Sequence, residues 1–90
     1  MTTPFMSVVT VAAGYAPLAA TRTILTRGDI SCPPGNLHPV LFKGPGFADV
    51  PWVPTEWHAF RGVDLAQIQV KGTAGETVTV VGYIGVEGGA

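Results

Sequence analysis

The side chains that could bind a metal ion are few and scattered. They are Cys32, His38, Asp49, His58 and Asp64, and none has the close-paired spacing that structural zinc sites use. Asp64 precedes Leu65-Ala66, where its carboxylate could accept backbone N–H groups in an Asx-turn, and Cys32 fits as a small buried hydrophobic residue. The sequence therefore predicts neither a metal site nor a cofactor.

Candidate nucleophiles are equally poorly supported. The only serines are Ser7 and Ser31, and neither lies in a Gly-x-Ser-x-Gly motif. Cys32 is followed by two prolines and has no base close to it in sequence. The carboxylates are too scattered to predict a glycosidase pair. We expect no catalytic residue and no enzymatic activity.

One short motif and the aromatic residues could bind a partner. The tripeptide Arg27-Gly28-Asp29 matches the integrin-binding sequence, but three residues recur by chance and the glycine equally suits a bulge or turn. Tryptophan and tyrosine are favoured anchors of protein interfaces, and prolines stiffen the Pro51–Trp57 segment, which we expect to protrude or to form a sheet edge. The predicted interface residues are Trp52, Trp57, Pro51, Pro54, Tyr15 and Phe47. A sugar-stacking platform of Trp52, Trp57, Tyr15 and Tyr83 is the alternative.

The elements that hold these side chains are predicted to be short strands. The chain has 12 glycines and 8 prolines in 90 residues, which leaves no uninterrupted window for an ordinary helix. Runs rich in β-branched or alternating apolar residues predict the strands. These runs are Ser7–Ala13, Thr21–Thr26 with an extension over Asp29–Cys32, Val40–Lys43, Phe47–Val53, Glu56–Arg61, Gln67–Lys71 and a last run containing Val78 and Val80.

The fold class follows from these strands. The alternation in Gln67–Lys71 places Ile68 and Val70 on one face, and the glycine-containing turn at 72–76 predicts a hairpin with the last run. Without a helical crossover the pairing must be antiparallel. We expect an all-β fold, a small antiparallel β-sandwich or barrel of about seven short strands that is jelly-roll-like. Residues 1–90 form one domain, with 85–90 as a flexible tail.

Composition indicates a surface made for contact with other proteins. Charged residues make up 12% of the chain, about half the usual share, and the net charge is −1. A weakly charged surface is easily desolvated, so we expect a homo-oligomer, with a trimer as one form, or a larger assembly. Neither nucleic acid nor membrane is an expected partner. Met1–Ala20 has no basic residue ahead of its apolar run, so it does not predict a secretory signal, and we expect synthesis in the cytoplasm.

Three segments carry a family resemblance. They are Ile30–Asn36 (ISCPPGN), Val40–Gly44 (VLFKG) and Val63–Glu76 (VDLAQIQVKGTAGE). Together they resemble small β-sandwich virion proteins of tailed bacteriophages, of the capsid decoration (cement) or head-fibre type. The resemblance extends over roughly Asp29–Gly82.

The resemblance implies a role in the virion. A cement protein would bind and stabilise the lattice of the major capsid protein, and this is the preferred interpretation. A head-fibre or tail component that contacts another virion protein is the first alternative. A carbohydrate-binding or receptor-binding β-sandwich module is the second.

Overall fold

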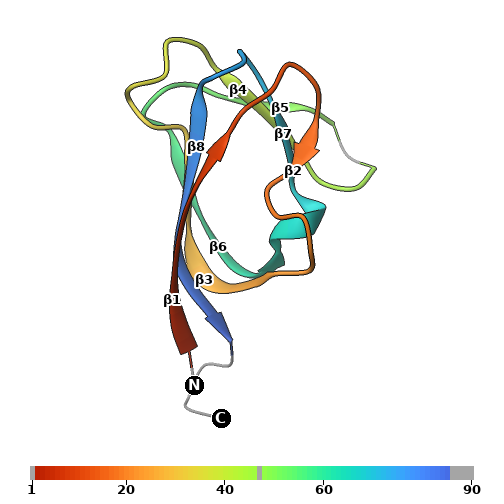
Figure 1. The fold of residues 1–90 in the computed structure, drawn as a ribbon, viewed down its shortest axis with the longest axis vertical. Helices are drawn as coiled ribbons and strands as arrows, with labels where there is room; N and C mark the ends of the chain where they lie inside the picture. Colours follow the sequence, from red (N-terminus) through yellow and green to blue (C-terminus); the bar gives the residue numbers. More distant parts are fainter. Residues whose placement is uncertain (1, 47, 86–90) are drawn as a thin grey trace.

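The computed structural model describes residues 2–46 and 48–85, which fold into two four-stranded antiparallel sheets (Figure 1). A short 3-10 helix, η1 (Leu65–Gln67), connects two of the strands. The strands are β1 (Thr2–Thr10), β2 (Ala16–Pro17), β3 (Ile24–Ser31), β4 (Val40–Lys43), β5 (Val50–Trp52), β6 (Trp57–Asp64), β7 (Gln69–Lys71) and β8 (Thr77–Gly85).

The strand order is that of a jelly roll. The first sheet has the order β1-β8-β3-β6 and the second β2-β7-β4-β5, so the chain repeatedly crosses between the sheets. All pairs are antiparallel. The predicted all-β sandwich is confirmed. The described chain has eight strands rather than about seven because the two-residue β2 is too short to show an alternation pattern.

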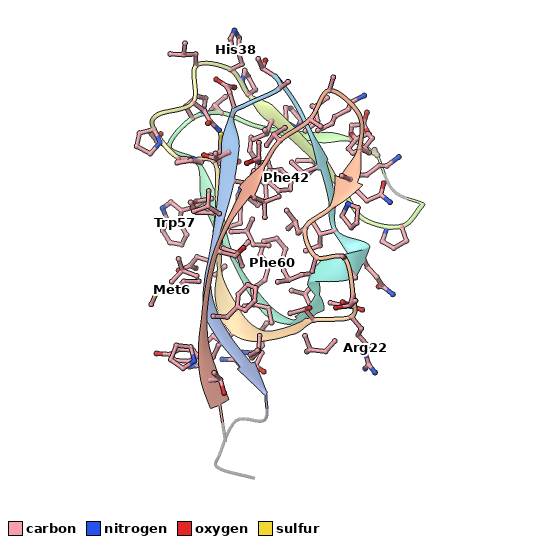
Figure 2. The ribbon with its side chains drawn as sticks, in the orientation of Figure 1. Met6, Arg22, His38, Phe42, Trp57 and Phe60 are labelled. Atoms are coloured by element: carbon pink, nitrogen blue, oxygen red, sulfur yellow. The ribbon has the colours of Figure 1, made fainter. Side chains whose placement is uncertain are left out.

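The core lies between the two sheets and combines aliphatic side chains with a few aromatic ones. In β8, Val78 and Val80 are buried whereas Val81 is exposed, as the alternation of a half-buried strand requires. Phe42 and Phe60 lie between the sheets (Figure 2). The buried hydrophobic residues are Val11, Leu18, Leu25, Ile30, Cys32, Val40, Phe42, Trp52, Leu65, Val70, Val78 and Val80.

Two facing glycines bring the central strands of the first sheet close together. Gly28 of β3 is opposite Gly82 of β8, and the same row continues to Phe5 of β1 and Phe60 of β6. A Cβ on Gly82 would lie 2.2 Å from the carbonyl oxygen of Arg27. Only glycine fits this approach.

The predicted hairpin of the last two strands is wrong. β7 pairs with β2 and β4 in the second sheet, whereas β8 pairs with β1 and β3 in the first. The connection at 72–76, in which Gly75 has a φ of +93°, therefore turns a corner between the sheets. Alternation identified the buried face of each strand correctly, but it carries no information about which strand lies alongside.

Several boundaries also differ from the expected ones. β1 covers Thr2–Thr10 rather than Ser7–Ala13, because Pro4 lies on a sheet edge where proline is tolerated. The irregularity in β3 lies between Leu25 and Arg27 rather than at Gly28. The tripeptide Arg27-Gly28-Asp29 lies inside β3, not in a protruding loop. Gly85 ends β8, and residues 86–90 of the predicted tail lie outside the described residues.

Candidate interaction surface

The outer face of the first sheet is the side turned away from the second sheet. In β1 the even-numbered residues from Pro4 to Thr10 are exposed, and the odd-numbered ones are half-buried against the core. The register then places Met6 beside Val81, and Val81 beside Asp29 of β3. Figure 2 shows Met6 and Trp57 projecting on this side, away from the second sheet. Alternate residues of each of the four strands therefore form the outer face.

Exposed apolar side chains gather on this outer face. Met6 and Val8 from β1 are 76% and 67% exposed, and Trp57 at the start of β6 is 60% exposed. Val81 and Tyr83 from β8 are also about half exposed. These five residues are called the apolar patch below. Scattered single apolar residues are normal on a protein surface, so five on one sheet face make this face the candidate interaction surface.

A shallow groove borders the apolar patch beside Trp57 and Val81. Ser31 of β3 and Thr79 of β8 are register partners in its lining, and their hydroxyl groups hydrogen-bond to each other. The lining also includes Asp29 and the loop residues Pro33 and Pro34. Because Trp57 is 60% exposed, its indole could enter a hollow on a partner.

The outer face of the second sheet is different in chemistry. The ammonium groups of Lys43 and Lys71 lie 4.3 Å and 4.7 Å from the centre of the Tyr15 ring, a cation–π arrangement. Desolvation of the Tyr15 hydroxyl and the nearby Asp49 carboxylate raise the pKa of Tyr15 to about 12. This face therefore carries a compact cluster of two cations around an aromatic ring.

Trp52 does not protrude, and its predicted role as an exposed anchor is wrong. It is the last residue of the edge strand β5, and it is only 5% exposed. Its ring stacks on Phe42 with the centroids 4.0 Å apart, and it meets His58 edge-on at 4.6 Å. The flanking prolines do place the segment at a sheet edge, as predicted. Alternation within β5 nevertheless turns Trp52 inward, while Pro51 is exposed.

The other predicted interface residues are dispersed. Trp57 lies on the apolar patch, whereas Tyr15 belongs to the charged cluster on the second sheet. Pro54 is half-buried between β5 and β6, and Phe47 lies outside the described residues. Sequence reasoning missed Met6, Val8 and Val81 and assigned Tyr83 to the sugar alternative. β1 gave no alternation signal, because its adjacent apolar pairs Phe5-Met6 and Val8-Val9 put apolar residues on both of its faces.

A second hollow opens between the two sheets, beside β5 and β6. Its lining includes Phe42, Trp52, Phe60 and Ile68, so it is an open margin of the hydrophobic core. The side chains of Lys43 and His58 also contribute to its lining. Among the described residues that line it, apolar side chains predominate.

The polar side chains singled out in the sequence have structural partners. Asp64 Oδ1 accepts hydrogen bonds from the backbone N–H groups of Ala66 and Thr23, each at 3.0 Å, so the predicted Asx-turn is confirmed. Cys32 is fully buried, as expected, and accepts a hydrogen bond from Asn36 Nδ2. His58 donates from Nε2 to Glu56 at 2.7 Å. Within residues 2–46 and 48–85, no three side chains of metal-binding type gather.

Comparisons with known proteins return no relatives. No protein-family model, no curated protein and no solved structure matches the chain. In the part of the chain that the structure describes, no helix is long and apolar enough to cross a membrane.

Proposed function

We propose that the protein is a non-enzymatic structural protein that docks onto a larger protein assembly through the apolar patch. The observation that carries the proposal is the exposure of five large apolar side chains on the outer face of the first sheet. This face displays Met6, Val8 and Trp57 to solvent, next to the exposed charged residues Arg27, Asp29 and Arg61. Burial of the apolar patch by a partner would remove the most exposed apolar sheet surface from water.

The specific assembly that we propose is the capsid of a tailed bacteriophage. The sequence resemblance to small virion proteins supports this choice, and a jelly roll is a common architecture among capsid components. The protein would act as a decoration, or cement, protein located in the virion, with the major capsid protein as its partner. It would strengthen the lattice because each bound copy stabilises only the assembled form.

A carbohydrate-binding role is the second candidate, and the groove favours it. The exposed indole of Trp57 lies beside the polar side chains of Asp29, Ser31 and Thr79. A flat aromatic ring next to hydrogen-bonding groups suits a sugar ring, and jelly rolls include lectin domains. Binding to a glycan array that is lost in Trp57→Ala would favour this role over docking onto a capsid.

The test of the docking proposal uses particles that lack the protein. Trp57→Ala should weaken binding to such particles by about 2 kcal/mol, or about 30-fold, as the loss of a tryptophan anchor in an interface does. Leu37→Ala is the matched control, because Leu37 is 83% exposed but lies in the loop between β3 and β4. Equal affinities for Trp57→Ala, Leu37→Ala and the unmodified protein would refute docking through the patch.

A further inference from the structure

β1 is an edge strand with an unusual composition. It is nine residues long, pairs with β8 alone, and contains no Lys, Arg, Asp or Glu. A long, uncharged edge strand offers a row of backbone donors and acceptors to any other strand, and proteins normally protect such edges with charges, prolines or bulges. In β1 the protection is limited to Pro4, near its beginning.

The other three sheet edges in the described chain are better protected. β6 carries Arg61 and Asp64 and is interrupted by Gly62, which has a φ of +65°. β2 has two residues and includes Pro17, and β5 has three and includes Pro51. Pairing with another strand is therefore most favourable at β1.

The register shows which amides of β1 face the free edge. Val11, just beyond β1, donates its backbone N–H to Glu76 at 2.7 Å, and in an antiparallel pair such bonding positions alternate along the strand. Odd-numbered residues of β1 therefore face β8. The amides of Met6, Val8 and Thr10 therefore point away from β8. Pro4 occupies another outward position, where its lack of an N–H removes no hydrogen bond to β8.

No other part of the described chain satisfies these outward groups. Outside the ladder with β8, the backbone of residues 4–10 has no hydrogen-bond partner among residues 2–46 and 48–85. Figure 1 shows β1 beside β8 at the outside of the first sheet. The outward amides of β1 are thus available to a strand from another molecule.

We propose that a second copy of this chain pairs with β1 through its own β1. An antiparallel pair of identical strands is related by a two-fold axis perpendicular to the sheet, so both copies use the same surface and the contact closes as a dimer. No like charges meet, because β1 carries none. The result is one eight-stranded sheet with the two apolar patches on the same side.

Such pairing would also enlarge the docking surface, a consequence that rests on the proposed function. Four strands spaced by about 4.8 Å and about 30 Å long give a face of roughly 570 Å² in plan. A stable interface usually buries about 800 Å² on each partner. Joining two faces doubles the area that one copy can offer to a partner, with Met6 and Val8 of both copies at the centre.

The test distinguishes the contribution of the outward backbone N–H of Val8 to dimerisation from the contribution of its side chain. Val8→Pro removes the outward N–H and should convert the dimer, twice 9.3 kDa in sedimentation, into a monomer. Val8→Ala shortens the side chain but keeps the N–H, so it should remain a dimer. In the unmodified dimer, amide-resolved hydrogen exchange at Met6, Val8 and Thr10 should be slower than in the diluted monomer by about tenfold or more.

Three results would overturn the pairing. They are a monomer at every concentration, a trimer, or a dimer in which the amides of Met6, Val8 and Thr10 exchange as fast as in the monomer. The exchange result decides the matter even if Val8→Pro fails to fold. If the protein dimerises but does not bind particles, the proposed function is refuted and the β1 pairing stands. If the protein binds particles but remains a monomer at every concentration, the pairing is refuted and the proposed function stands.

Discussion

The two tryptophans show how one residue type takes opposite roles in this fold. Both lie in the Pro51–Trp57 segment, yet Trp52 is buried and Trp57 is largely exposed. The sequence indicated that the segment is an edge, because its prolines interrupt regular pairing. It could not show which indole faces inward, because that depends on Phe42 and Phe60, which lie on strands brought together only by the fold.

Trp52→Ala should destabilise the fold. The substitution removes a large side chain that stacks on Phe42, and we expect a loss of about 3–5 kcal/mol in the free energy of unfolding. Trp57→Ala should change the free energy of unfolding by no more than about 0.5 kcal/mol, because the Trp57 side chain is on the surface. Urea denaturation measures both values, and a Trp52→Ala variant as stable as Trp57→Ala would contradict the placement of the core.

Glu56 gives the connection between β5 and β6 a dependence on pH. Its carboxylate accepts hydrogen bonds from the His58 ring and from the Val53 backbone N–H, and these lower the pKa of Glu56 from its ordinary value of 4.5. A lowered pKa stabilises the fold above the unfolded-state value, and this contribution is lost as the pH falls through the native pKa.

Glu56→Gln should therefore reduce stability at neutral pH but not in acid. We expect its melting temperature to lie below that of the unmodified protein at about pH 7, and the difference to shrink as the pH falls through the lowered pKa of Glu56 and its carboxylate becomes protonated. Thermal denaturation at a series of pH values measures this difference. A gap that stays constant across this pH series would show that the carboxylate charge contributes nothing.

At the scale of elements, the strands were easier to predict than their neighbours. Val40–Lys43 was predicted with its observed bounds, and alternation correctly assigned Val70, Val78 and Val80 to the core. The pairing of β8 with β1 joins residues 67 (Thr10 and Thr77) to 83 (Thr2 and Gly85) positions apart, and no local pattern encodes such contacts. The apolar patch was missed for the same reason, since it combines side chains from β1, β6 and β8.

The close approach of β3 and β8 gives a prediction about two glycines. Gly82→Ala would place a Cβ 2.6 Å from Gly28 Cα and should destabilise the protein by about 1–3 kcal/mol or more. Gly14→Ala is the control, because nothing lies within 4 Å of its added Cβ, and it should change stability by about 0.5 kcal/mol or less. If both variants unfold at the same urea concentration, the two strands cannot be this close.

At the scale of the molecule, the jelly roll leaves the outer face of each sheet on the surface. The core joins the two sheets, and the outer faces are then free to differ. Lys43, Lys71 and Tyr15 form a cation–π cluster on the second sheet, whereas the first displays Met6, Val8 and Trp57 beside Arg27, Asp29 and Arg61. Composition predicted a weakly charged surface overall but could not show which apolar side chains share a sheet face.

The orientation of the protein in an assembled particle tests the docking claim most directly. Electron cryomicroscopy of particles carrying the protein would show which outer face contacts the lattice. We predict that the apolar patch around Met6, Trp57 and Val81 is buried against a neighbouring protein, with Lys43 and Lys71 facing solvent. A map in which the second sheet contacts the lattice and the apolar patch is open to solvent would contradict it.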